Sequence, residues 1–250
     1  MPDVPASTIS TRDMGFAGSN QDMEARYLRS DNVETLPGIV LVHDVYGVTP
    51  HIEALAQAYA GVGYAVMVPN MYSRGDGPAP GWPPRTAEIA KIGNFPDPRT
   101  IEDLKGAVSA LKAREDVDAN RVAIVGYSFG ARYGLFATAQ GAEVAALVCF
   151  YPIIIYPALH KNRPLQPLQS VNPLKTPVLV TYGERDSLVP TTHVNFFREL
   201  LRGQGKTHEF YTYPVADHGF VNTMIKTHHT EAANDAWRKT ITFLDKHLRK

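Results

Sequence analysis

The stretch Val125-Gly126-Tyr127-Ser128-Phe129-Gly130 (VGYSFG) places one serine between two glycines, directly after a run of β-forming residues. Written as G-x-S-x-G, it matches the nucleophile elbow, in which a serine occupies a tight turn between a strand and a helix. Glycines on either side let neighbouring backbones approach closely. Because a turn serine can also cap a helix, the motif indicates catalysis only if a base and an acid follow elsewhere in the chain.

The elbow lies in a chain whose apolar runs have the length of strands. Most of these runs are continuous and do not alternate with polar residues, as in strands that are buried on both faces. Apolar residues recur at helical spacing between the runs, in 101–111 and 233–248. This alternation predicts an α/β fold with a mostly parallel central sheet and helices on both faces. The apolar runs are 38–43, 64–69, 121–127, 145–151, 177–183 and 209–214.

Three segments depart from the alternation. The N-terminal stretches 14–18 and 24–30, joined by a polar turn, predict an antiparallel hairpin that leads into the sheet. Residues 70–100 and 152–176 are long and rich in turn-forming residues, and loops of this length often border a binding site. Because neither an internal repeat nor a linker is evident, we expect one domain over residues 1–250.

Composition excludes several classes of partner. The 250 residues carry 25 Lys and Arg against 25 Asp and Glu, without a sustained basic run, which argues against nucleic acid or an anionic membrane as partner. The N-terminus lacks a signal-peptide pattern, and no window reaches the roughly 18 apolar residues of a membrane span. The single cysteine, Cys149, lies in an apolar run and excludes an internal disulfide. We expect a soluble, cytoplasmic protein with no membrane partner.

Two later strand ends supply the partners that Ser128 needs. The run 177–183 is followed by Asp186, and the run 209–214 is followed by His218. The carboxyl ends of parallel strands meet at one edge of a sheet, and the order serine, aspartate, histidine is that of α/β-hydrolases. We therefore predict that Ser128 is the nucleophile, that His218 accepts its proton, and that Asp186 orients the imidazole.

Other readings of these residues remain open. Asp186 could simply cap the next helix, and His218 could hydrogen-bond a turn. Asp217 adjoins His218 and is poorly placed to orient its ring, whereas Glu184 stays a second candidate for the acid. His43 ends the first apolar run and is a candidate for a supporting role. The nine histidines form no H-E-x-x-H arrangement, so no metal site is predicted.

Four segments in the same order resemble the dienelactone hydrolase family, from about residue 36 to the C-terminus. They are similar to that family's first strand and acidic loop with the following helix and strand, its elbow, its acid segment and its base segment. The resemblance implies a compact α/β-hydrolase fold without a large lid domain, and hydrolysis of an ester or lactone. It gives Ser128, Asp186 and His218 the roles stated above. The segments are 40–75, 125–138, 182–190 and 216–220.

The resemblance also implies an oxyanion hole, formed by the backbone N–H groups of Phe129 and Val45. Two residues depart from the best-known members, which carry cysteine in place of Ser128 and glutamate in place of Asp44. A hydroxyl has no readily accessible anion, so Ser128 must depend on His218 as general base. Asp44 is then either a catalytic support residue or a hydrogen-bonding residue of its loop. The sequence leaves open whether Ser128 is native or replaces a cysteine.

The substrate pocket shows a third departure. Family members that act on dienelactone hold its carboxylate with arginines, one of them shortly after the catalytic histidine, where this chain has Asn222. Arg74 is the best-placed remaining cation, although charged loop residues are usually solvated. Aromatic residues at the predicted strand ends could form an acyl pocket, and core packing explains each of them equally well. These residues are Tyr46, Tyr72, Trp82, Tyr127, Phe129 and Tyr151.

We therefore expect an enzyme that hydrolyses a small carboxylic ester or lactone through a Ser-His-Asp triad and an acyl-enzyme, without a metal or organic cofactor. One alternative keeps the triad and makes the protein an acyltransferase, thioesterase or peptidase. Another is a non-catalytic ligand-binding protein on a hydrolase fold. The natural substrate and the oligomeric state are left open by the sequence.

Overall fold

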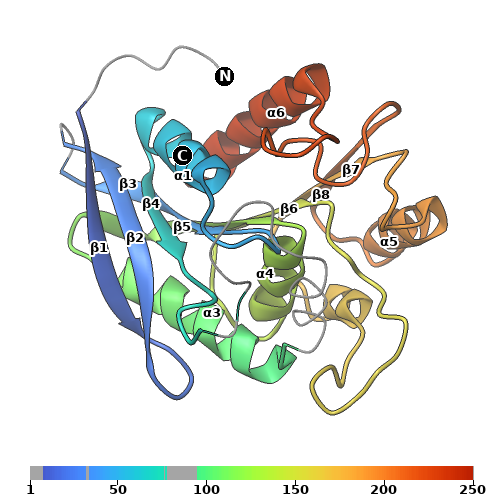
Figure 1. Ribbon diagram of the computed structural model, residues 1–250, viewed down its shortest axis with the longest axis horizontal. Helices are drawn as coiled ribbons and strands as arrows, with labels where there is room; N and C mark the ends of the chain where they lie inside the picture. The colour runs from blue at the N-terminus through green and yellow to red at the C-terminus, as the bar shows by residue number, and fades with distance from the viewer. Residues whose placement is uncertain (1–7, 32–33, 76, 78–94, 250) are drawn as a thin grey trace.

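Eight strands form one sheet through the middle of the protein (Figure 1). They are β1 (Ile9–Ala17), β2 (Asp22–Ser30), β3 (Leu36–Val42), β4 (Ala65–Pro69), β5 (Val117–Tyr127), β6 (Ala146–Phe150), β7 (Val178–Gly183) and β8 (His208–Tyr213). Their order is β1-β2-β4-β3-β5-β6-β7-β8, with parallel pairing from β4 to β8 and antiparallel pairing at the β1 and β2 edge. The computed structural model describes residues 8–31, 34–75, 77 and 95–249.

Helices cover both faces of this sheet, which confirms the predicted α/β architecture. They are α1 (Pro50–Gly61), α3 (Asp97–Lys112), α4 (Phe129–Ala139), α5 (Thr191–Gly203) and α6 (Thr230–Leu248), with a short 3₁₀ helix η1 (Pro167–Val171). Helices α1 and α6 lie on one face, and α3 and α4 lie on the other (Figure 1).

The apolar residues that predict helices lie against the sheet. In α3, Ile101, Leu104, Val108 and Leu111 are all buried, as the helical spacing predicts. Burial of each such side chain stabilises the fold by about 1.5–3 kcal/mol. Helix α6 starts after His229, whose ring accepts a hydrogen bond from the backbone N–H of Ala232 at 3.3 Å and so caps the helix.

The N-terminal hairpin is also confirmed, since β1 and β2 pair antiparallel. A buried ion pair holds its tip to the rest of the molecule: Arg74 Nη1 lies 2.5 Å from Asp103 Oδ2 on α3. The backbone N–H of Ser19, in the hairpin turn, donates to Asp103 Oδ1 at 2.7 Å. Arg74 also donates to the side chain of Asn20. The hairpin, the loop after β4 and α3 are therefore connected through one carboxylate.

The parallel strands bring the expected site segments to one edge of the sheet. The carboxyl ends of β3, β5, β7 and β8 are followed by Asp44, Ser128, Asp186 and His218, respectively. Strand β5 starts at Val117, four residues before the predicted run. Cys149 is buried in β6, as its apolar neighbours indicate.

Candidate active site

Ser128 occupies a strained turn between β5 and α4. Its φ is +49° and its ψ is −102°, a conformation that non-glycine residues rarely adopt. A Cβ on Gly126 would collide with the backbone of Gly130, and a Cβ on Gly130 would collide with the carbonyl of Val42. The two glycines of the motif are therefore needed because α4 packs directly on the ends of β5 and β3.

Ser128, His218 and Asp186 are joined by hydrogen bonds in a line. Ser128 Oγ lies 2.8 Å from His218 Nε2, and His218 Nδ1 lies 2.9 Å from Asp186 Oδ2 and 3.1 Å from Oδ1. The Asp186 carboxylate can only accept, so the proton of the neutral ring is on Nδ1 and Nε2 accepts from the serine hydroxyl. The Asp186 side chain is 1% exposed and the His218 side chain 12%.

The loops that carry the acid and the base are fixed by backbone hydrogen bonds. Asp186 Oδ1 accepts the N–H groups of Leu188 and Val189, at 2.9 and 2.8 Å. The backbone N–H of Arg185 donates to the carbonyl of Ala216 at 3.0 Å, which joins the two loops. These contacts keep the Asp186 carboxylate from rotating away from the imidazole.

The two competing acids lie elsewhere. Asp217 Oδ1 accepts the backbone N–H groups of Ser187 and His218, at 2.7 and 2.6 Å, and so braces the loop without touching the imidazole. Glu184 accepts from the Thr212 hydroxyl at 2.8 Å. Of the carboxylates considered from sequence, Asp186 is the one that meets the ring of His218.

The loop after β3 borders the site through Val45. Among the described residues, neither the N–H of Val45 nor that of Phe129 donates a hydrogen bond, and both residues line the cavity that contains Ser128. The loop is held by Asp44 Oδ1, which accepts the N–H of Tyr46 at 2.9 Å. The Tyr72 hydroxyl donates to the carbonyl of Val45 at 3.1 Å and fixes the other side of the same peptide.

Asp44 is a buried carboxylate with one side-chain partner. Asn222 Nδ2 donates to Asp44 Oδ2 at 3.0 Å, and Asn222 Oδ1 accepts the N–H of Met224 at 2.9 Å. Burial raises the pKa of Asp44 to about 6. Asn222 thus connects the segment after the base to the loop of Val45. In the sequence, Asn222 stands out only as the residue at the place where an arginine is missing. The signal for this position is its spacing, four residues after His218.

His43 also holds the loop that carries Asp44 and Val45. Its Nδ1 lies 2.6 Å from the carbonyl of Asp44, and its Nε2 accepts the N–H of Met71 at 3.1 Å. Burial lowers the pKa of His43 to about 4, so the ring is neutral at pH 7 with its proton on Nδ1. It stacks on Phe129 with ring centroids 5.8 Å apart.

A cavity of about 870 Å³ opens over Ser128 and His218. Of the aromatic residues predicted for the pocket, Tyr46, Phe129 and Tyr151 line it. Tyr151 has a φ of +40°, and its ring packs edge-on against the His218 ring at 4.8 Å. The segment 152–176, expected to border the site, contributes a mainly apolar wall. Other residues that line the cavity are Ile153, Ile154, Ile155, Tyr156, Leu188 and Val189.

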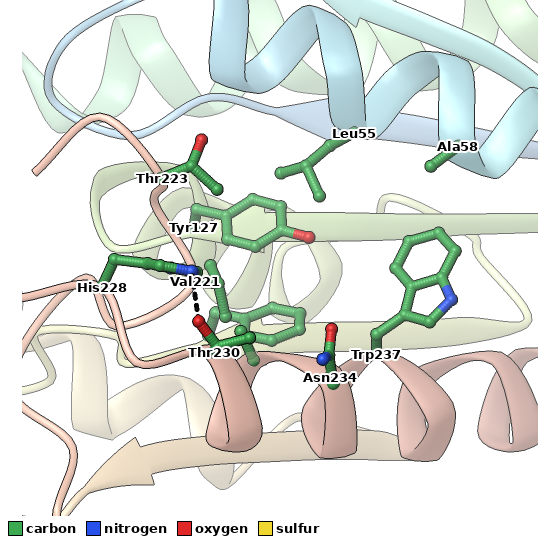
Figure 2. Close-up of a pocket in the computed structure, with 11 residues that line it drawn as sticks. Leu55, Ala58, Tyr127, Val221, Thr223, His228, Thr230, Asn234 and Trp237 are labelled. Atoms are coloured by element: carbon green, nitrogen blue, oxygen red, sulfur yellow. Dashed lines mark hydrogen bonds between the residues drawn. The ribbon is translucent and has the colours of Figure 1, made fainter. Parts of the chain in front are cut away.

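The other predicted pocket residues lie elsewhere, and Trp82 lies outside the described residues. Arg74 does not meet the cavity because its guanidinium binds Asp103. Tyr72 is a support of the Val45 carbonyl and not a lining residue. Tyr127 faces a smaller cavity on the α1 and α6 side of the sheet (Figure 2), because adjacent residues of a strand point to opposite faces.

Two arginines that sequence reasoning missed also line the large cavity. Arg132 is 5% exposed, its guanidinium lies over the rings of Tyr133 and Tyr156, and its Nε has no hydrogen-bond partner among the described residues. The guanidinium of Arg163 also lies over the Tyr156 ring, with its Cζ 4.5 Å from the ring centroid. Arg132 is one helical turn after Ser128, and helix side chains point back toward the N-terminus, so its spacing carried a usable signal.

Within the described ranges, no group of three or more His, Cys, Asp or Glu side chains could hold a metal ion. None of the helices placed by the structure combines the length and apolar composition needed to cross a bilayer.

The sheet order, and the hydrogen-bonded serine, histidine and aspartate at its carboxyl edge, are those of the α/β-hydrolases. The family model described as "Dienelactone hydrolase family" matches residues 23–248. The chain belongs to the dienelactone hydrolase family.

Similar proteins span nearly the same length. A crystal structure from Klebsiella pneumoniae, assigned as a dienelactone hydrolase, superposes with a TM-score of 0.87 at 28% identity, over 95% of this chain and 98% of that one. A Salmonella typhimurium protein assigned as a carboxymethylenebutenolidase is 27% identical over 95% of this chain and 88% of its own length. The carboxymethylenebutenolidase of Rhodococcus opacus is 28% identical over 84% of this chain and 81% of its own.

Proposed function

We propose that the protein is a serine-dependent hydrolase of small carboxylic esters or lactones. The observation that carries the proposal is the line of hydrogen bonds from Ser128 through His218 to Asp186, beside a large cavity that is also lined by Val45 and Phe129. The carboxymethylenebutenolidase relatives support a lactone as the bond cleaved.

The first half of the reaction forms an acyl-enzyme. Ser128 Oγ attacks the carbonyl carbon while its proton passes to His218 Nε2, and Asp186 stabilises the imidazolium through Nδ1–H. The charge that develops on the carbonyl oxygen is met by the N–H groups of Val45 and Phe129. Removing one such donor typically costs about 10²–10³ in rate. The C–O bond then breaks, and His218 returns the proton to the leaving alkoxide, which in a lactone stays attached to the acyl group.

The second half uses water as the nucleophile. His218 Nε2 takes a proton from water as it attacks the ester carbonyl, and the same N–H groups bind the second oxyanion. Collapse of this intermediate releases the carboxylic acid and returns the proton to Ser128 Oγ. A hydroxyl nucleophile requires the general base in each half.

Among lactones, the cavity favours one that carries a carboxylate. Arg132 and Arg163 place positive charge on a wall that is otherwise apolar, and planar guanidinium groups suit carboxylates. Asp97 lies near both arginines, but its carboxylate accepts the hydroxyls of Tyr133 and Tyr156, and burial raises its pKa. We expect an acid-bearing lactone to have a higher kcat/KM than its methyl ester.

The proposal is tested by labelling the protein with a fluorophosphonate probe and mapping the modified peptide. We expect label on Ser128, none in Ser128→Ala, and full labelling in the control Ser187→Ala, which changes another serine at the cavity. Label on a different residue would contradict the proposal. If no residue is labelled and short p-nitrophenyl esters are not turned over, the protein is a non-catalytic binder on this fold.

A second comparison identifies the acid. Asp186→Asn should lower kcat by about 10⁴, because the amide favours the wrong imidazole tautomer. Asp217→Asn keeps an oxygen that can accept the same two N–H groups, so its kcat should change less than about tenfold. Equal losses in the two variants would remove Asp186 from the proposed role.

A further inference from the structure

A second cavity, of about 110 Å³, lies on the opposite face of the sheet from α4, between α1 and α6 (Figure 2). Leu55 and Ala58 of α1 form one side, and Asn234 and Trp237 of α6 form the other. The cavity shares no described lining residue with the cavity over Ser128. It is therefore a separate candidate site, which the proposed hydrolysis does not use.

The floor of this cavity is aromatic, and its size allows at most one ring. Tyr127 and Phe150 stack with centroids 4.5 Å apart and an interplanar angle of 18°. Trp237 closes one end, where it packs on Tyr59. An apolar protein cavity of about 150 Å³ binds benzene. This cavity is smaller, about 110 Å³, so a ligand with at most one six-membered ring can enter it and a polycyclic ligand is excluded.

Polar groups line one side of the ring-sized space. The Asn234 side chain points into it from α6 (Figure 2), and its amide has no hydrogen-bond partner among the described residues. His228 Nδ1 lies 3.1 Å from the carbonyl of Phe220. Because a carbonyl can only accept, the neutral ring carries its proton on Nδ1, and its Nε2 is an acceptor. The Thr230 hydroxyl lies 3.4 Å from His228 Nε2. No Lys, Arg, Asp or Glu is among the described lining residues, so the site suits a neutral ligand.

We propose that this cavity binds a neutral, single-ring aromatic molecule with one hydroxyl or amino group, of the phenol or aniline class. The ring lies over Tyr127 and Phe150, and the polar group exchanges a hydrogen bond with the Asn234 amide. The amide offers both a donor and an acceptor, so it accommodates either substituent. This binding does not depend on the proposed function.

The cavity adjoins the backbone that holds the candidate triad. The N–H of Ser128 donates to the carbonyl of Phe150 at 2.9 Å. Thr227, the residue before His228, donates its hydroxyl to the carbonyl of His218 at 2.7 Å. A ligand on Phe150 and His228 therefore contacts the neighbours of both the nucleophile and the base. If the proposed function holds, phenol should change kcat for a small ester and leave KM unchanged, since it does not occupy the substrate cavity.

Binding is measured by titrating the full chain with phenol and with toluene, followed by NMR of backbone, Asn234 amide and Trp237 indole N–H signals. We expect saturable shifts at Asn234 and Trp237 with a Kd for phenol on the order of 1 mM, because a ligand of so few atoms makes few contacts. Asn234→Leu should weaken phenol about five- to tenfold, through loss of a hydrogen bond, and leave toluene binding nearly unchanged.

Filling the space should abolish binding of both molecules. Ala58→Leu, or Ala233→Leu if the first variant loses its dispersed spectrum, places a larger side chain in the cavity, and Ala113→Leu makes the same exchange at an exposed position as the control. Shifts centred on the Ser128 cavity, equal affinity for phenol and toluene, or binding that survives the filled cavity would each overturn the proposal. The readout is independent of labelling at Ser128, so failure of the proposed function would not affect it.

Discussion

Among the described non-glycine residues, positive φ occurs at two positions in the candidate site, one in the triad and one beside it. Ser128 and Tyr151 are the two non-glycine residues with positive φ in the part of the chain that the structure describes. Each such conformation costs on the order of 1–3 kcal/mol and persists only where the surroundings enforce it. Here the N–H of Ser128 is bound by the carbonyl of Phe150, and the N–H of Tyr151 by that of Thr181. The last residue of β6 therefore holds the backbone of Ser128, and β7 holds the backbone of Tyr151.

Asp44 predicts a specific pH dependence of stability. Its pKa is about 6 in the folded protein and about 3.9 in an unfolded chain, so the folded state binds the proton more tightly. The contribution of Asp44 is therefore fully present below about pH 4 and is lost as the pH rises through 6. Relative to Asp44→Asn, the wild-type free energy of unfolding should fall by roughly 2 kcal/mol between pH 4 and 7.5.

Denaturant unfolding of both proteins across this range measures the difference. Asp118 is a control of opposite sign, because hydrogen bonds from the Asn120 N–H and the Arg121 side chain lower its pKa. Relative to Asp118→Asn, the wild type should lose stability as the pH falls below about 4, through the lowered pKa of Asp118, and should change little between pH 4 and 7.5. A wild-type to Asp44→Asn difference that stays constant with pH would contradict the assignment of a buried, shifted carboxylate.

At the scale of elements, the site depends on how closely α4 approaches the sheet. Gly130 in its first turn lies directly on the carbonyls of Val42 and His43 at the end of β3. That approach places the N–H of Phe129 beside the loop that carries Val45. A displacement of α4 would separate the two proposed oxyanion donors.

Gly130→Ala should therefore be strongly destabilising, by about 3 kcal/mol or more, because the added methyl group meets backbone atoms that cannot move aside. Gly203→Ala at the end of α5 adds the same methyl group where no atom lies within 4 Å, and it should be neutral or stabilising by up to about 1 kcal/mol. Thermal unfolding of the two variants measures the contrast. Similar stability of both proteins would show that α4 can shift without cost.

The sequence predicted the elements better than the faces they present. Every expected strand exists. The start of β5 was predicted four residues too late, because its first residues include polar side chains and do not continue the apolar run. The order of Ser128, Asp186 and His218 along the chain sufficed to predict their meeting. Tyr127 could not be assigned to a face, because a strand buried on both sides has no alternation to read. Asn222 was missed because its partner, Asp44, lies 178 residues away.

For the whole molecule, the N-terminal hairpin is secured by the Arg74 and Asp103 ion pair. The two side chains are 7% and 2% exposed, and the carboxylate also binds the hairpin turn at Ser19. A charged residue in a loop gave no sequence signal for this role, since its partner is on a helix 29 residues later. The pair connects the antiparallel edge of the sheet to α3.

Asp103→Ala should destabilise the protein by about 3–5 kcal/mol, because it leaves the Arg74 guanidinium buried without its counter-charge. The matched control is Glu199→Ala, which breaks an exposed pair with Arg202, at 56% and 74% exposure, and should cost less than about 1 kcal/mol. Chemical denaturation gives both values. Comparable losses in the two variants would rule out the buried pair as the anchor of the hairpin.

Each of the two strands β5 and β6 lines the small cavity with its last residue, and the residue that follows the strand lines the large cavity. Tyr127 and Phe150 face the small cavity, and the next residues, Ser128 and Tyr151, face the large one. Gaining or losing a single residue inside β5 or β6 would exchange what each cavity presents. Insertions and deletions that leave both sites intact are therefore confined to the loops. The register of β5 and β6 fixes both sites at once, so neither can change its strand residues independently of the other.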